Sequence, residues 1–182
     1  KLTALPAEIG QLTELRGLDL LYNKLTFLPA EIGQLTHLQE LNLSSNQLNA
    51  LPAEIGQLIQ LQRLSLSLNQ LTSLPAEIGN LVQLQELYVN NNKLTALPKE
   101  IGQLTQLQQL YLIHNELSAL PAEIGQLTQL QRLEIYLNKE LQNLPLTFSA
   151  LHQLTYIDIE DTAIDQVQLE NLQNVWQRAR AS

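Results

Sequence analysis

The chain has 182 residues, 45% of them hydrophobic, and a formal net charge of −8 at pH 7. This composition predicts a folded, soluble domain, and no apolar run approaches the roughly 20 residues that cross a bilayer. Ten scattered lysines and arginines in an acidic chain exclude nucleic acid as the ligand, and the lack of cysteine excludes disulfides, thiolate metal sites and a cysteine nucleophile.

The chain is a tandem array with a period of 23 residues. Each copy follows the pattern LxxLxLxxNxLxxLPxxIGxLxx, counted from its first leucine. The most regular markers are Asn23, Asn46, Asn69, Asn92, Asn115 and Asn138, together with Pro6, Pro29, Pro52, Pro75, Pro98 and Pro121. A copy of this size cannot bury its own leucines, so neighbouring copies must stack.

Each copy predicts a strand followed by one short helical turn. Leu41 and Leu43 alternate with period two, which is typical of a strand, whereas Pro52 suits the first turn of a helix. Stacking then gives a parallel sheet on the concave side of a curved solenoid. We expect the amide of each repeated asparagine to bond buried backbone groups. We expect glycines such as Gly56 to relieve a tight backbone position.

The last copy departs from the pattern. One residue is inserted after Asn138, which predicts a bulge, and Thr162 and Phe148 replace the usual asparagine and isoleucine. From Asp165 to Ala179 we expect a capping helix with Asp165 as its N-cap. Its apolar face comprises Val167, Leu172, Val175, Trp176 and Ala179.

The domain organisation follows from these ends. Residues 1–164 hold about seven repeats, the first one incomplete, and residues 165–182 hold the capping helix and a tail. The chain lacks methionine and begins inside a repeat at Lys1, so we expect earlier repeats or a cap before it. The lack of cysteine favours a cytosolic or bacterial setting only slightly, and the compartment stays open.

The LPxxIGxLxxLxxLxLxxN motif resembles the leucine-rich repeat, in the form found in intracellular Ras-associated proteins, bacterial repeat proteins and the arms of Roco GTPases. The resemblance covers Lys1 to about Ile164. It implies an α/β solenoid, a right-handed horseshoe with a parallel sheet on the concave face and short helical turns on the convex face. It also implies that the concave face binds other proteins. The ligase activity of the bacterial LPX effectors is not implied, because their repeats are shorter and their catalytic domain uses a cysteine.

The residues that do not repeat lie at positions three, five, seven and eight of each copy. Alternation along a strand points the first three of these positions at the concave side, with position eight close by. All five tyrosines occupy such positions, and Tyr88 and Tyr111 share position five in adjacent strands. We therefore predict a partner-binding surface made of Tyr88, Tyr111, Ile113, His114, Arg132, Glu134, Tyr136, Leu137, Tyr22 and Tyr156.

Two other interpretations of these residues stay open. The tyrosines can stabilise the sheet through cross-strand contacts alone, and Leu68 and Leu137 can belong to the core instead of a binding surface. Near the C-terminal end, Asp158, Glu160, Asp161 and Glu134 gather negative charge. This charge suits a basic partner segment, a solubilising end or, least well, a cation site.

The remaining residues favour a binding module over an enzyme. His37, His114 and His152 fall at three different repeat positions, and no phosphate-binding loop or HExxH motif occurs. We therefore expect no catalytic residues, no metal and no cofactor. The predicted function is recognition of a protein or peptide by a monomer, without nucleic-acid binding or membrane insertion.

The sequence also allows three other functions. The first is a regulatory or scaffolding arm of a larger signalling protein of the Roco or kinase type. The second is a hydrolase centred on His114 and neighbouring carboxylates. The third is self-association through the open N-terminal end, where leucines and a strand edge lie uncovered.

Overall fold

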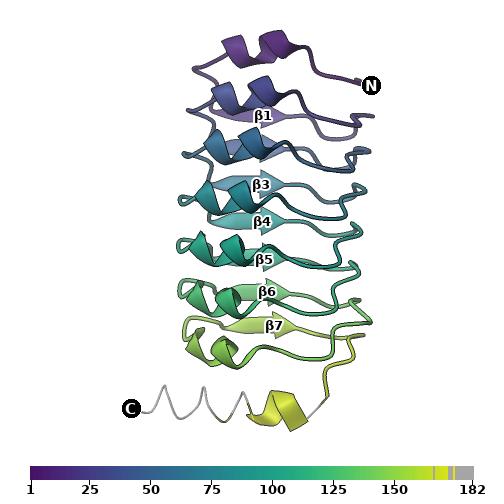
Figure 1. Ribbon diagram of the computed structural model, residues 1–182, viewed down its shortest axis with the longest axis vertical. Coiled ribbons are helices and arrows are strands. Elements are labelled where there is room, and N and C mark those ends of the chain that lie inside the picture. The colour runs from purple at the N-terminus through teal and green to yellow at the C-terminus, as the bar shows by residue number, and fades with distance from the viewer. Residues whose placement is uncertain (166, 172–173, 175–182) are drawn as a thin grey trace.

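Seven short 3-10 helices alternate with seven strands in a computed structural model that describes residues 1–165, 167–171 and 174 (Figure 1). The helices are η1 (Ala7–Gln11), η2 (Ala30–Gln34), η3 (Ala53–Gln57), η4 (Ala76–Asn80), η5 (Lys99–Gln103), η6 (Ala122–Gln126) and η7 (Leu146–Ala150). The strands are β1 (Gly17–Asp19), β2 (Glu40–Asn42), β3 (Arg63–Ser65), β4 (Glu86–Tyr88), β5 (Gln109–Tyr111), β6 (Arg132–Glu134) and β7 (Tyr156–Asp158).

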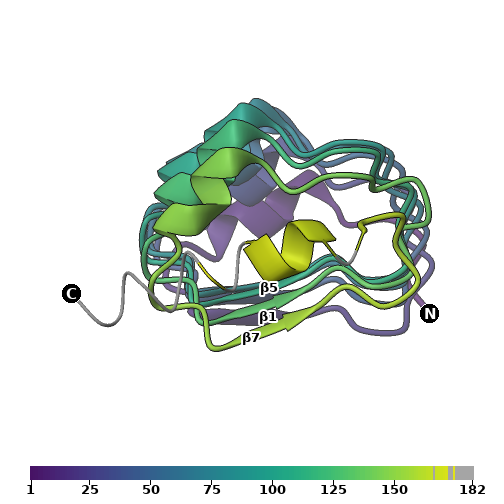
Figure 2. The ribbon, with the colours of Figure 1, turned by 90° about the horizontal axis from the view of Figure 1, so that it is seen from below.

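The strands form one parallel sheet in the order β1 to β7. Partners across the sheet lie one period apart, as in Leu41 beside Leu64. Between β6 and β7 the offset grows by one residue, pairing Leu133 with Ile157, because the inserted residue lies in a turn after Asn138. The helices line the side of the core opposite to the sheet (Figure 2). This confirms the predicted α/β solenoid, a horseshoe with the sheet on its concave side.

The leucines of neighbouring copies form one continuous core. In the second copy Leu41, Leu43 and Leu48 are at most 1% exposed. The partial repeat before Leu15 has no neighbour on one side, and there Leu2 and Leu12 are 49% and 53% exposed, whereas their equivalents one period later are fully buried. Burying a leucine stabilises the fold by about 1.5 to 3 kcal/mol, so most of the stability comes from contact between copies.

The repeated asparagine bonds two copies together. The side-chain amide of Asn92 donates to the carbonyls of Val89 at 3.1 Å and, in the preceding copy, of Leu66 at 3.0 Å. Its Oδ1 accepts the N–H of Leu71 at 3.0 Å. The same bonds recur at Asn46, Asn69, Asn115 and Asn138. Each asparagine therefore satisfies buried backbone groups, as predicted.

The residue before each of these anchors has a left-handed backbone. Position eight has φ between 53° and 60° in every copy, at Tyr22, Ser45, Leu68, Asn91, His114, Leu137 and Asp161. The reversal turns the chain so that the following side chain enters the core. Asparagine and aspartate tolerate this region, whereas leucine is strained there by roughly 1 kcal/mol. The sequence pattern did not reveal this constraint.

The repeated glycine acts through its size. None of the seven glycines, all within the described residues, has a positive φ. A Cβ on Gly56 would lie 2.5 Å from the carbonyl oxygen of Glu77, and one on Gly79 would lie 2.7 Å from that of Glu100. The backbone position is therefore tight, as expected, but because the next copy lies close to it and not because the glycine needs an unusual φ. Its lack of a side chain lets successive 3-10 helices pack closely.

A helix follows the last copy, as predicted. The carboxylate of Asp165 accepts the N–H of Gln168 at 2.7 Å, which is the expected N-cap bond. The Gln168 side chain in turn accepts the N–H of Leu144 at 3.1 Å. Leu169 packs against the core, but Val167 is 64% exposed, so Val167 does not belong to the covering face. Leu172, Val175, Trp176 and Ala179, the rest of the predicted face, lie outside the described residues. No helix in the described part of the chain is long and apolar enough to cross a membrane.

Replacing Gly56 by alanine should lower the free energy of unfolding by about 1 to 3 kcal/mol, because the added Cβ meets the backbone of the next copy. Urea unfolding followed by circular dichroism measures this change. Gly17→Ala is the matched control, since a Cβ there has no atom within 4 Å. An equal loss in both variants would contradict the packing role.

Replacing Leu68 by asparagine should raise the free energy of unfolding by about 0.5 to 1 kcal/mol, because asparagine tolerates the left-handed backbone and Leu68 is already 52% exposed. The control is Leu21→Asn, which removes another exposed leucine at a position without positive φ. Urea unfolding measures both variants. If Leu21→Asn raises the free energy of unfolding as much as Leu68→Asn does, backbone strain is not the cause.

Candidate partner-binding surface

The solvent-facing side of the sheet, called here the sheet face, carries the side chains at positions three, five and seven. Burial follows the expected alternation: Leu110 at position four is fully buried, while its neighbours Gln109 and Tyr111 are partly exposed. Leu112 at position six is again fully buried. The variable residues at these positions therefore lie side by side on one surface.

Two tyrosines from adjacent strands stack on this face. Tyr88 of β4 lies beside Tyr111 of β5 in the sheet register. Their ring centroids are 4.6 Å apart and their planes differ by 9°. Such a pair contributes roughly 0.5 to 1.5 kcal/mol beyond the area that it buries, so the two rings hold each other in place.

Arg132 extends the stack towards the last copy. Its guanidinium carbon lies 4.0 Å from the ring centroid of Tyr156 and 5.9 Å from that of Tyr111. Its Nε donates to the carboxylate of Glu134 at 2.6 Å. We call Tyr88, Tyr111, Arg132 and Tyr156 the aromatic ladder. It runs from β4 to β7 as a stacked tyrosine pair followed by the cation–π contacts of Arg132 with Tyr111 and Tyr156.

Polar neighbours fix the ladder from its sides. The hydroxyl of Tyr88 donates to Glu86 at 2.6 Å, and that of Tyr111 donates to Gln109 at 2.8 Å. Glu86 also accepts a bond from Arg63 at 2.9 Å. Glu86, Gln109 and Arg63 were missing from the predicted site. Their spacing in the sequence could have revealed these contacts, because positions three and five of one copy both face outward and lie close together.

The protonation of the ladder is fixed near neutral pH. Burial raises the pKa of Tyr88, and its bond to Glu86 raises it further. Burial also raises the pKa of Tyr111. The hydrogen bond to Glu134 raises the pKa of Arg132. The phenols therefore stay neutral and the guanidinium stays charged, so the surface offers hydroxyl groups, aromatic faces and one neutralised cation.

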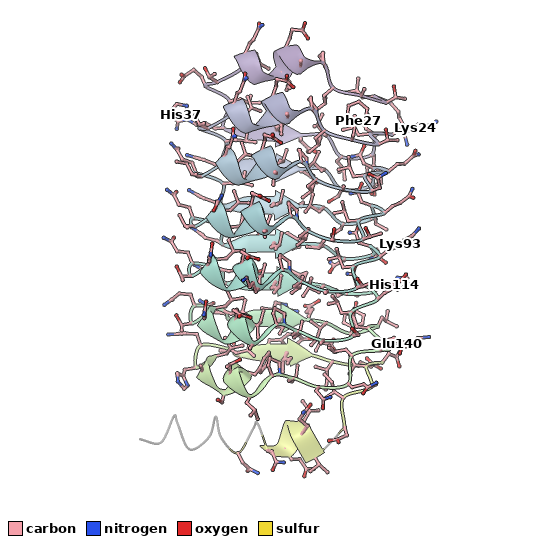
Figure 3. The ribbon with its side chains drawn as sticks, viewed as in Figure 1. Lys24, Phe27, His37, Lys93, His114 and Glu140 are labelled. Carbon is pink, nitrogen blue, oxygen red and sulfur yellow. The ribbon has the colours of Figure 1, made fainter. Side chains whose placement is uncertain are left out.

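The other predicted residues border the ladder at the ends of the strands. Ile113, Tyr136 and Leu137 are half-buried, and His114 is exposed with its Nδ1 2.9 Å from the side-chain oxygen of Asn91. A hollow of about 580 Å³ opens at this edge, lined by His114, Leu137, Lys139 and Glu140 among others. His114 and Glu140 share the edge, opposite to His37 (Figure 3).

The structure separates the predicted residues into three groups. Tyr88, Tyr111, Arg132, Glu134 and Tyr156 make direct contacts, and Ile113, His114, Tyr136 and Leu137 adjoin them in the same copies. Tyr22 lies apart from them in the first copy and is 62% exposed. Leu68 is 52% exposed, so the interpretation of this residue as core is wrong. In the described part of the chain, no three histidine, aspartate or glutamate side chains gather into a metal site.

Comparisons with known proteins agree with this geometry. A family model described as a leucine-rich repeat region matches residues 4–93 and 54–116. The structure of a leucine-rich repeat protein from Leptospira interrogans is 48% identical, with a TM-score of 0.83 over 88% of this chain and 41% of that one. A comparison with curated proteins found no match.

Two plant receptors are also similar. The ectodomain of the Arabidopsis thaliana membrane receptor kinase GASSHO1/SCHENGEN3, solved in complex with Casparian strip integrity factor 2, is 36% identical. Its TM-score is 0.78 over 87% of this chain and 20% of that one. The plant peptide hormone receptor RGFR1 in complex with RGF2 is 36% identical, with a TM-score of 0.74 over 88% and 31%.

This chain spans less than half of each of these three solved proteins. In this chain the strand order and the asparagine bonds follow the same repeat that the family model matches. The chain belongs to the leucine-rich repeat family.

Proposed function

We propose that this chain is a recognition module that binds a protein or peptide on its sheet face, centred on the aromatic ladder. The family fold is typically a non-catalytic binding scaffold, and two of the similar structures are receptors with a bound partner. The observation that carries the proposal is the series of contacts from Tyr88 to Tyr156, which presents aromatic groups on the surface formed by the variable positions of the strands.

Pre-ordering of the ladder supports this role. Tyrosine and arginine are enriched among the residues that dominate interface energies. Ordering a side chain on binding costs about 0.5 to 1.5 kcal/mol, and the stacking and hydroxyl bonds of Tyr88 and Tyr111 have already met that cost. Tyr156 remains 42% exposed, which leaves apolar area for a partner to cover.

The chemistry of the same residues supports binding over catalysis. The raised pKa values of Tyr88, Tyr111 and Arg132 leave them poorly suited to exchange a proton near pH 7. The imidazole of His114 contacts the Asn91 amide, whereas the hydrolase hypothesis needs a carboxylate there. The module is therefore proposed to be non-enzymatic. The alternative of a regulatory arm in a Roco or kinase protein uses the same surface, and no feature of the described residues favours it.

Tyr111→Ala should weaken a complex about thirtyfold or more, because it removes the central ring of the ladder and one support of Tyr88. The probe is a peptide selected from a displayed random library on the wild-type chain, and its affinity is measured by calorimetry. Circular dichroism checks that the variant is folded.

Phe27→Ala provides the matched control. Phe27 is an aromatic residue that is 54% exposed, and it lies at the side edge of the repeat array near its N-terminal end, away from the ladder (Figure 3). Its loss should leave the affinity unchanged. A peptide that binds the Tyr111 variant as tightly as the wild type would place the binding site elsewhere.

A further inference from the structure

Building on the proposed function, we propose that the partner is an extended segment with a basic residue near each end. At one end, the side chain of this lysine or arginine lies in a hollow over the first three copies. The other basic end lies over the last copy, and the aromatic ladder contacts the part between them. This assigns a chemical class to the partner and a position along the sheet face to each part of it.

The charge of the variable positions carries the first step. Positions three, five, seven and eight hold seven carboxylates: Asp19, Glu40, Glu86, Glu134, Asp158, Glu160 and Asp161. The same positions hold two arginines, Arg63 and Arg132, which gives a formal charge of −5. The whole chain carries −8, so more than half of its net charge lies on this one surface.

Both arginines are already neutralised within the molecule. Arg63 pairs with Glu86 at 2.9 Å, and Arg132 bonds Glu134 at 2.6 Å. These are the two ion pairs found among the described residues. An acidic partner would have to displace one of these carboxylates, whereas a basic partner meets carboxylates, such as Asp19 and Asp158, that form no ion pair in the described part of the chain.

At the first end the carboxylates border a hollow. Its volume is about 260 Å³, and it is lined by Gly17, Asp19, Glu40, Asn42, Arg63 and Ser65, together with Leu18 and Leu41 of the strands. The small residues Gly17 and Ser65 give it depth. Ser65 lies beside Tyr88 in the sheet register, so the hollow begins where the ladder ends. Asp19 and Glu40 are exposed at its border, which suits an ammonium or guanidinium group.

At the second end three carboxylates follow the ladder. Asp158 lies beside Glu134 in the register, and its Oδ1 accepts the N–H of Glu160 at 3.1 Å. Glu160 and Asp161 are exposed at the end of the strand. Both ends of the sheet face are therefore acidic, and the ladder lies between them.

The spacing of the two ends sets the length of the partner. From β1 or β2 to β7 there are five or six strand intervals, which at about 4.8 Å each span roughly 24 to 29 Å. An extended peptide rises about 3.4 Å per residue, so about seven or eight residues separate its basic groups.

The test uses a displayed library of random peptides of about twelve residues, selected on the wild-type chain. Selected peptides should carry lysine or arginine at both ends, about seven or eight positions apart. Asp19→Asn with Glu40→Gln, and separately Asp158→Asn with Glu160→Gln, should each weaken their binding about threefold to tenfold in dilute buffer and less at high salt. Glu8→Gln with Glu77→Gln is the control, since it removes two exposed carboxylates from the helical side with no expected change.

The outcomes separate this inference from the proposed function. Neutral or acidic selected peptides, or basic ones insensitive to both pairs of substitutions, overturn the inference. If Tyr111→Ala still abolishes the binding of such peptides, the proposed function stands without it. If selected peptides are indifferent to Tyr111→Ala, the proposed function itself fails.

Discussion

The structure depends on the bonds that each copy makes with the one before it. The leucines of a single copy cannot be buried alone, and the backbone around the turn after each strand needs the amide of the next asparagine. Because Asn92 bonds both its own copy and the preceding one, a shift of register would break hydrogen bonds and expose leucines together. The inner positions are therefore constrained by stability, whereas the sheet face remains free to vary.

The repeat made most of the fold predictable. A strict period with alternating leucines implies one strand per copy and parallel neighbours, and the insertion after Asn138 appears in the structure as a changed register between β6 and β7. Two features were not predictable from the pattern. The role of Gly56 depends on the distance between copies, which a repeat pattern does not contain. The left-handed backbone at Leu68 was hidden because leucine rarely adopts it.

The candidate site was predictable as a surface but not as a set of contacts. Alternation along the strand placed Tyr88 and Tyr111 on one face, and their adjacent copies implied that they meet. The contacts depend on side-chain rotamers, and the rotamer in one copy depends on the side chains of its neighbours. These rotamers determine which group each tyrosine hydroxyl bonds, and they place Arg132 over Tyr156 while it bonds Glu134. These rotamers determine the protonation and rigidity of the ladder, and the sequence pattern alone does not predict them.

A stacked array also allows two properties of the proposed binding surface to be set in different copies. The aromatic ladder in the later copies offers area and rigidity, which favour affinity but discriminate little between partners, because many side chains can cover a flat ring. At the first end of the face, Asp19 and Glu40 lie in copies that hold no part of the ladder, whereas at the last end Asp158, Glu160 and Asp161 share the copy of Tyr156. In the proposed complex both groups favour a partner of opposite charge and repel others. Each copy contributes its variable residues on the same framework, so charge can change at Glu40 without moving Tyr111. The sheet face can therefore change its selectivity without changing the interactions that hold the stack together.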